Sequence, residues 1–217
     1  MTSAEASAAY GRRSSEYIDL LGTIDATASR DRDLIGSWAA AQAGPILDVG
    51  CGPGHWTNWL REQGVDVEGV DPTPEFLDHA RKSFPDSRFR EATAEDLGVG
   101  DAGLAGVLAW YSLIHTPPER IHHALGEFAR TIRPGGGLLV GFFEGAEIEP
   151  FDHAVTTGYF WPVDELADAI EEAGFTVVAS ETRTDAGARP HGAITATRTP
   201  DRSNFARNST PEPLAAP

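Results

Sequence analysis

The sequence predicts an α/β fold in which a mostly parallel sheet is covered by helices on both faces. Strand-like and helix-like segments alternate from residue 45 to residue 183. The last two strand-like segments have no helix between them, which predicts an antiparallel pair at the end of the chain. The 217 residues, 41% hydrophobic and 23% charged, suit one globular domain with a full core.

The segment before the alternation predicts two short helices over residues 10–42. Tyr17, Leu20, Leu21 and Ile24 recur at helical spacing, and Gly44-Pro45 ends the pattern. Residues 1–9 are small and polar, so we expect them to be frayed. We interpret residues 1–44 as an N-terminal helical lid.

Residues 45–198 then form the predicted main domain, with a seven-stranded sheet whose last strand runs antiparallel. The expected strands are 45–50, 65–71, 87–93, 105–115, 135–145, 175–183 and 191–199. The expected helices are 55–64, 74–84, 118–133 and 162–174. The tail over residues 199–217 is rich in Pro, Ser and Asn, and we expect it to be disordered.

Composition excludes several classes of function. The formal net charge of −16 disfavours nucleic acid as the main partner, because such a surface repels a phosphate backbone. Cys51 is the single cysteine, so neither an intrachain disulfide nor a cysteine-based zinc cluster can form. No segment is long and apolar enough to span a membrane. We therefore expect a cytoplasmic protein with no metal and no membrane partner.

The stretch ILDVGCGPG, residues 46–54, predicts a ligand-binding turn after a buried strand. Gly50, Gly52 and Gly54 allow the backbone to approach a ligand, and a helix from His55 points its free N–H groups at the turn. Asp71 ends the second strand, where a carboxylate can accept hydrogen bonds from both ribose hydroxyls. Together these features predict a nucleoside.

The spacing and charge of this turn favour S-adenosylmethionine over a nicotinamide dinucleotide. The turn has the pattern G-x-G-x-G, whereas the dinucleotide fingerprint is G-x-G-x-x-G. Asp48 would repel a pyrophosphate, but it suits a ligand that carries an ammonium group.

Six segments in order resemble the successive motifs of the class I S-adenosylmethionine-dependent methyltransferases. They are LDVGCGPG, GVDPTPEFLDHAR, FREATAEDL, LAWYSLIH, FARTIRPGGGLLVGFFEG and YFWPVDELADAIEEAGFTVV. The resemblance is to small bacterial members that act on small molecules. It implies a Rossmann-like three-layer sandwich and methyl transfer to N or O of a small-molecule metabolite.

The resemblance also implies roles for individual residues. The residues implied for the cofactor are Tyr17, Asp48, Gly50, Cys51, Gly52, Asp71, Pro72, Thr73, Thr93, Ala94, Glu95, Trp110 and Tyr111. Among them, Asp48 to Gly52 would line the methionine part, Asp71 the ribose, and Ala94 and Glu95 the adenine edge. Where the family often has Gly-Asp-Ala, this chain has Ala92-Thr93-Ala94, so that Thr93, Glu95 or Asp96 would make the adenine contact. Tyr10, Arg13 and Tyr17 are candidate lid contacts.

Candidates for the acceptor side follow the fourth and fifth strands. His115 is the predicted general base because the ordinary pKa of histidine, about 6.5, suits proton transfer, and Tyr111 is the second catalytic candidate. The predicted acceptor-binding residues are His115, Phe143, Glu144, His153, Tyr159 and Trp161. His191 begins the last strand and could reach the mouth of the pocket.

Two other classes of function stay open on the sequence. The first is an NAD(P)-dependent oxidoreductase, and the second is a non-catalytic cofactor-binding or scaffold protein. A nucleic-acid methyltransferase is disfavoured because the matching place reads Ala-Trp-Tyr-Ser, without the Pro-Pro-aromatic motif of exocyclic amine methylation. The expected partner is a small-molecule acceptor, and the protein is expected to be a monomer or a homodimer.

Overall fold

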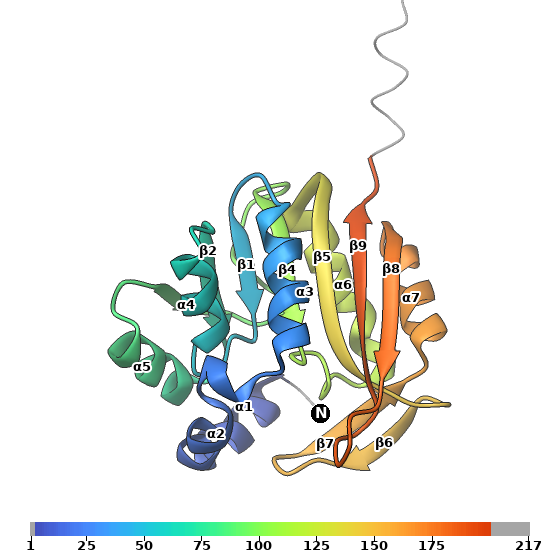
Figure 1. The fold of residues 1–217 in the computed structure, drawn as a ribbon. Coiled ribbons are helices and arrows are strands. Elements are labelled where there is room, and N and C mark those ends of the chain that lie inside the picture. The colour runs from blue at the N-terminus through green and yellow to red at the C-terminus, as the bar shows by residue number, and fades with distance from the viewer. Residues whose placement is uncertain (1–2, 201–217) are drawn as a thin grey trace, which may run out of the picture.

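The computed structural model describes residues 3–200, which form one twisted sheet with helices packed on both of its faces (Figure 1). The helices are α1 (Ser3–Arg12), α2 (Ser14–Leu21), α3 (Ser29–Ala40), α4 (His55–Glu62), α5 (Pro74–Ser83), α6 (Ile121–Thr131) and α7 (Val163–Glu172), with short 3₁₀ turns at Ile24–Ala26 and Pro118–Arg120. The strands are β1 (Ile46–Val49), β2 (Val67–Asp71), β3 (Arg88–Glu91), β4 (Leu104–Trp110), β5 (Ile132–Glu144), β6 (Glu149–Asp152), β7 (Thr157–Trp161), β8 (Phe175–Arg183) and β9 (His191–Arg198).

The order of the strands fixes where a ligand can bind. Strands β3, β2, β1, β4 and β5 lie side by side and run parallel. Beyond β5, the antiparallel strand β9 pairs with both β5 and β8. The chain leaves β1 toward β2 on one side and returns to β4 on the other, so strand order reverses between β1 and β4. In open α/β sheets the crevice outside the carboxyl ends at such a reversal is the ligand site.

Consecutive residues of the central strands supply the two faces of the sheet with their cores. Leu47 packs into the cluster that includes Phe128 of α6 and Ile170 of α7. Its neighbour Ile46 packs into the cluster on the opposite face, which includes Trp38 of α3. This alternation follows from the period of two in a strand. Helices α6 and α7 therefore cover one face, and α3 and α4 cover the other.

The predicted α/β class, the parallel core and the antiparallel last strand are confirmed, but the predicted number of seven strands is wrong. The sheet has nine strands, because the segment after β5 forms the β6–β7 hairpin instead of a loop. The hairpin joins the sheet through Phe143 and Glu144, which pair in parallel with Phe160 and Trp161 of β7. The segment contains many acidic and aromatic residues, so the alternating pattern of its two short strands is difficult to recognise in the sequence.

The prediction that residues 1–9 are frayed is also wrong for residues 3–9, which lie in α1. Contacts with the main domain hold this helix, among them a hydrogen bond of 2.7 Å from Ser7 Oγ to the carbonyl oxygen of Pro72. The region before β1 contains three helices rather than two. The expected disorder of the tail concerns residues that lie, from 201 onward, outside the described part. Over residues 3–200, no helix combines the length and apolarity needed to cross a membrane.

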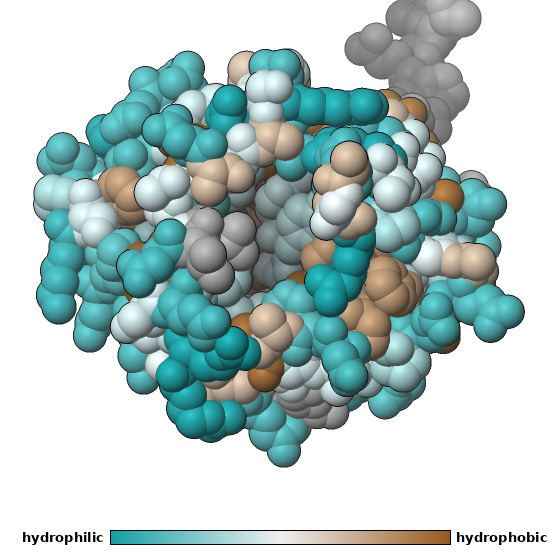
Figure 2. Space-filling view, turned by 60° about the horizontal axis from the view of Figure 1, so that its bottom comes forward, coloured by the Kyte–Doolittle hydropathy of each residue, from teal (hydrophilic) through white to brown (hydrophobic). Residues whose placement is uncertain are grey.

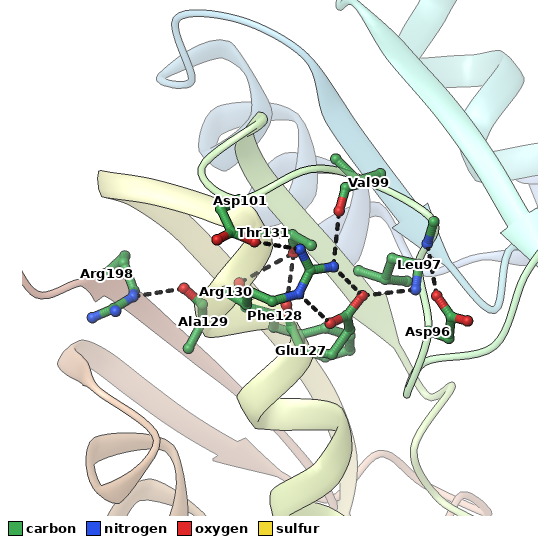
Figure 3. Close-up of polar contacts among 11 residues, drawn as sticks. Asp96, Leu97, Val99, Asp101, Glu127, Phe128, Ala129, Arg130, Thr131 and Arg198 are labelled. Carbon is green, nitrogen blue, oxygen red and sulfur yellow. Dashed lines mark hydrogen bonds and ion pairs between the residues drawn. The ribbon is translucent and has the colours of Figure 1, made fainter.

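A polar network on α6 holds the loop that joins β3 to β4 (Figure 3). Arg130 contacts Asp101 at 2.6 Å and donates to the carbonyl oxygen of Val99 at 2.8 Å. Arg130 also pairs with Glu127, which accepts the backbone N–H of Leu97 at 2.9 Å. The hydrogen bonds from Arg130 hold the pKa of Glu127 below its usual range. This network fixes the far end of a loop whose first residues face the site described below.

We predict that Glu127→Ala loosens this loop without unfolding the domain. The variant removes the acceptor of the Leu97 N–H, so hydrogen exchange at that amide should accelerate about tenfold, the factor for roughly 1.4 kcal/mol of lost hydrogen bonding. Amide exchange measured by NMR checks it, with the exposed Glu172→Ala on α7 as a matched control. Unchanged exchange at Leu97 would contradict the assigned role of Glu127.

Candidate functional site

A cavity of about 540 Å³ opens at the carboxyl ends of the parallel strands. Figure 2 looks onto this face, which is hollowed near its middle, with both hydrophilic and hydrophobic residues around the opening. Helices α1 and α2, the loops after β1, β2, β3 and β4, the end of β5 and the β8–β9 loop all contribute to its walls. A cavity of this size suits a ligand of a few hundred daltons.

The glycine turn after β1 forms part of the wall. Gly50 and Gly52 have φ angles of 71° and 53°, in the left-handed region that favours glycine. A Cβ atom at Gly50 would lie 2.3 Å from the Cβ of Ser112, so the turn packs tightly against the end of β4. A Cβ at Gly52 would meet only the ring of Tyr17, at 4.0 Å, because this residue faces the cavity. The backbone of Gly52 is thus open to a ligand.

The carboxylate of Asp71 ties β2 to the glycine turn. Its side chain accepts the N–H of Gly52 at 2.9 Å and the N–H of Thr73 at 2.8 Å. Asp71 is only 5% exposed and lines the cavity, and its burial raises the pKa of the carboxyl. Each carboxylate oxygen has more than one acceptor position. Asp71 can therefore hold the turn and accept hydrogen bonds from a ligand at once.

A second buried carboxyl, Asp48, lies under the same turn. Its Oδ2 accepts a hydrogen bond of 2.6 Å from the hydroxyl of Thr57 on α4. Burial raises the pKa of Asp48 to about 7. Cys51 is buried as well, and burial raises the pKa of its thiol, so this cysteine is a poor nucleophile at neutral pH.

Two buried polar atoms on this wall have no hydrogen-bond partner among the described residues. They are His55 Nδ1 and Ser112 Oγ, and both residues line the cavity. Burial lowers the pKa of His55 to about 4, so its ring is neutral at pH 7. Because unsatisfied buried polar atoms are costly, this pair indicates that a polar ligand belongs here.

His115 lies where the loop after β4 meets α1. Its Nδ1 lies 2.7 Å from the carbonyl oxygen of Thr157, and its Nε2 lies 2.8 Å from the hydroxyl of Tyr10. Since a carbonyl can only accept, Nδ1 carries the proton and Nε2 accepts from Tyr10. Burial lowers the pKa of His115 and raises that of Tyr10, so both groups are neutral at pH 7.

Tyr111, at the end of β4, joins a second polar chain on the opposite wall. Its hydroxyl contacts His191 Nδ1, and His191 Nε2 lies 3.3 Å from Asp185 Oδ2. Tyr111 has a φ of 55°, which is uncommon for a residue with a side chain and is found at functional sites. Burial raises the pKa of Tyr111, so the phenol is protonated. The ring centroid of Phe143 lies 5.1 Å away and adds an aromatic surface.

The structure brings most of the predicted site residues together. Those that line the cavity are Tyr17, Asp48, Gly50, Cys51, Gly52, Asp71, Pro72, Thr73, Ala94, Glu95, Trp110, Tyr111, His115, Phe143 and His153. Tyr10 also lines it, whereas Arg13 does not and instead pairs with Glu16 at the surface. The pKa of His153 is lowered to about 4, mainly by burial.

Four predicted residues lie away from the lining. Thr93 forms an isolated antiparallel bridge with Asp96. Tyr159 and Trp161 pack with the core on the α6–α7 side, because both point to the same face of β7. Glu144 sits at the end of β5, where its N–H donates to the carbonyl oxygen of Pro190.

Several site residues carried no recognisable signal in the sequence. Asp31 reads as part of a charged surface helix, yet it is 7% exposed and lines the cavity. Arg183 comes from the end of β8 and lies 2.6 Å from Asp31, and its partner Asp185 sits in the following loop. The pairing of β8 and β9 beside β5 brings Arg183 and Asp185 to the cavity. Within residues 3–200 no group of three metal-binding side chains is found.

Comparison with known proteins finds a likeness to methyltransferases over part of the chain. Residues 46–136 match the family described as "Methyltransferase domain". An uncharacterized methyltransferase of Mycobacterium tuberculosis is 40% identical over 98 residues, which are 45% of this chain and 39% of that protein. A dTDP-3-amino-3,4,6-trideoxy-alpha-D-glucopyranose N,N-dimethyltransferase of Streptomyces venezuelae is 32% identical over 117 residues, 53% of this chain and 48% of that protein. The matches span less than half the length of both relatives.

One solved structure resembles almost the whole chain. It is the 1,6-didemethyltoxoflavin-N1-methyltransferase of Burkholderia thailandensis, with bound 1,6-didemethyltoxoflavin and S-adenosylhomocysteine. The TM-score is 0.73 at 23% identity, and the match covers 92% of each chain. At this identity the likeness supports the fold of the chain alone.

We predict that Asp48 makes the free energy of unfolding decrease as pH rises from about 4 to about 7. Its carboxyl ionises near the ordinary value of 3.8 in the unfolded chain but near 7 in the folded protein. Across that window the folded state binds more protons, so stability falls with pH. At 1.36 kcal/mol per pH unit, the loss is of the order of 2–4 kcal/mol.

Urea unfolding at pH 4.5, 6 and 8 checks this prediction, with Asp48→Asn as the comparison. The amide cannot ionise and can still accept from Thr57. The free energy of unfolding of the variant minus that of the native protein should therefore increase as the pH rises. A difference that stays constant across the three pH values would show that the buried carboxyl does not titrate there.

Proposed function

We propose that this chain, whose residues 46–136 match a methyltransferase domain, is a class I S-adenosylmethionine-dependent methyltransferase that transfers a methyl group to a nitrogen or oxygen atom of a small-molecule metabolite. The observation that supports the proposal is a cavity in which Gly52 and Asp71 form one wall and the aromatic residues after β4 form another. One wall suits a nucleoside, and the other suits a separate acceptor.

The residues of the first wall fit the methyl donor. Asp71 would bind the ribose hydroxyls, and the open backbone of Gly52 would lie along the methionine part. Asp48 would ionise on meeting the α-ammonium group, which offsets the cost of burying its charge. Pro72 and Ala94 line the cavity beyond Asp71, where the adenine ring would pack.

The second wall fits a small, partly flat acceptor. Trp110, Tyr111 and Phe143 present aromatic surface, and His115 and His153 add polar groups. S-adenosylmethionine, when bound, supplies a methyl carbon that its sulfonium makes electrophilic. The chain has to align the acceptor atom and exclude water, which is catalysis by proximity. A cavity of about 540 Å³ supports a metabolite as the acceptor.

The N-terminal segment, residues 1–44, is proposed as a lid over the cavity. Its described part covers the opening through α1 and α2, which supply Ser7, Tyr10 and Tyr17 to the lining. The ring of Tyr10 packs 5.7 Å from that of Phe76 on α5, and its hydroxyl reaches His115. Exchange of ligands through this opening would require α1 to move.

The alternative of a nicotinamide oxidoreductase is disfavoured by charge. Two carboxyl groups, Asp48 and Asp71, lie beneath the turn where a pyrophosphate would bind. The alternative of a non-catalytic binding protein is disfavoured by the cavity itself, which continues past the nucleoside wall to His153 and His191.

Calorimetric titration with S-adenosylhomocysteine, NADH and NADPH tests the proposed cofactor. We expect micromolar binding of S-adenosylhomocysteine alone, weakened about 30-fold or more in Asp71→Asn, since the ribose would lose charge-assisted hydrogen bonds worth roughly 2 kcal/mol. Asp86→Asn removes an exposed carboxylate and serves as the matched control. Binding of a nicotinamide cofactor instead would overturn the proposed function.

Limited proteolysis tests the lid. Trypsin can cleave after Arg12 and Arg13 only when α1 opens, so S-adenosylhomocysteine should slow this cleavage. Tyr10→Phe removes the hydrogen bond to His115 and should accelerate cleavage about tenfold, the factor for roughly 1.4 kcal/mol. Tyr159→Phe is the control, because Tyr159 makes no part of the cavity lining. Cleavage that responds to neither change would contradict a lid that closes over the ligand.

A further inference from the structure

We propose that His191 accepts the proton that the acceptor loses during methylation, that the proton travels through the hydroxyl of Tyr111, and that Asp185 positions His191 for this task. The inference rests on the proposed methyltransferase function and deepens it. It also names the acceptor class: a flat molecule that arrives with its reacting nitrogen or oxygen protonated, as a ring N–H or an aromatic hydroxyl.

The three groups form a continuous chain from the cavity to the surface. Tyr111, His191 and Asp185 all line the cavity. Tyr111 contacts His191 Nδ1, and the rings of the two residues stack with centroids 6.0 Å apart. His191 Nε2 faces Asp185 at 3.3 Å. The side chain of His191 is 14% exposed and that of Asp185 is 56% exposed, so the far end of the chain reaches water.

The carboxylate of Asp185 sets the tautomer of His191. The hydrogen bond from Arg183 holds the pKa of Asp185 below its usual range, so this group is ionised at neutral pH. An ionised carboxylate can only accept, so the proton of neutral His191 lies on Nε2. Nδ1 is then free to accept from the hydroxyl of Tyr111. Arg183 is held in turn by its ion pair with Asp31 of α3.

His115 and His191 each take part in a series of hydrogen bonds at the cavity, and the two series end at different groups. His115 donates to the neutral carbonyl of Thr157, and burial lowers its pKa, so this ring resists a second proton. His191 ends at an ionised carboxylate, which stabilises an imidazolium by a charge-assisted hydrogen bond. Proton acceptance therefore belongs to His191, and His115 holds α1 through Tyr10.

The proposed step balances in atoms and charge. The acceptor atom uses its lone pair to form the new bond to the methyl carbon, and the donor sulfur keeps the electron pair of the broken bond. The acceptor gives its proton to the oxygen of Tyr111 as the Tyr111 proton passes to His191 Nδ1. The positive charge thus leaves the donor and ends on the imidazolium beside Asp185.

The burial of the Tyr111 hydroxyl supports its role as a proton relay. Its pKa is raised by burial, so the phenolate is not populated at neutral pH and the residue cannot act alone as a base. In the proposed step it gives and receives a proton at once and stays neutral. Its left-handed backbone at the end of β4 directs the phenol into the cavity, close to the ring of Phe143 on which a flat acceptor would stack.

The first test is the tautomer of His191 in the full chain, measured by ¹⁵N NMR of histidine-labelled protein at pH 8.5. We expect the proton on Nε2, an Nδ1 signal that moves when Tyr111→Phe removes its donor, and a smaller Nε2–H population in Asp185→Asn. The variant His191→Asn assigns the signals. A proton on Nδ1, or signals unchanged in both variants, would overturn the relay whether or not the protein transfers methyl groups.

The second test is turnover of tritiated S-adenosylmethionine with four flat probes: 4-methylphenol, 4-nitrophenol, 2-hydroxypyridine and lumazine. We expect methylation of at least one probe. For the probe that reacts, His191→Asn should lower kcat about 10²-fold with little change in KM, the usual effect of losing an acid–base group. His122→Asn, on the exposed face of α6, is the matched control.

Three comparisons separate this inference from the proposed function. S-adenosylhomocysteine should bind His191→Asn as it binds the native protein, because His191 is not assigned to the nucleoside wall. His191→Gln should restore little of the lost turnover, since an amide cannot take up the proton. Failure of all four probes with a cofactor-binding protein would overturn the acceptor class, and a larger loss in His115→Asn than in His191→Asn would overturn the choice of His191.

Discussion

The site depends on the hydrogen bonds that the buried carboxylate of Asp71 accepts. The carboxylate accepts two backbone N–H groups, from Gly52 and Thr73, which belong to two different loops. Backbone donors buried without partners are costly, so this side chain fixes the glycine turn relative to β2. The same carboxylate faces the cavity. One residue thus shapes the loops and offers acceptor positions to a ligand, and its loss affects both together.

Burial of acidic groups around one cavity gives the site its electrostatic character. Burial raises the pKa of Asp48, Asp71, Tyr10 and Tyr17, and the charge of Asp71 raises the pKa of the other three further. Such a site resists anions and gains from a ligand that carries positive charge. A sulfonium with an α-ammonium group is a ligand of this kind, whereas a pyrophosphate would add charge of the same sign.

The cavity wall proposed for the nucleoside could be predicted from the sequence because its residues are close along the chain and their types are restricted. Gly50, Gly52 and Asp71 each have a conformational or charge requirement that few residue types meet. The acceptor half comes from contacts between distant segments. The sequence predicts Trp161 at the acceptor, but its pattern does not indicate β7 as a strand, so it cannot assign the face of the sheet on which this residue lies.

His191 is a further residue whose contacts cannot be predicted from the sequence, because its partners come from other segments. The sequence places His191 at the start of the last strand, within possible reach of the pocket mouth, but it does not identify Tyr111 and Asp185 as its partners. Its proposed role follows from β9 lying between β5 and β8, which brings His191 into contact with Tyr111 although the two residues are 80 positions apart in the sequence. The partner Asp185 belongs to the loop between β8 and β9, which does not pack in the core. The residue at this position can therefore be a different one in a related protein that has the same sheet and the same nucleoside wall. The acid–base group would then change with the acceptor, and the fold that holds the donor would be retained.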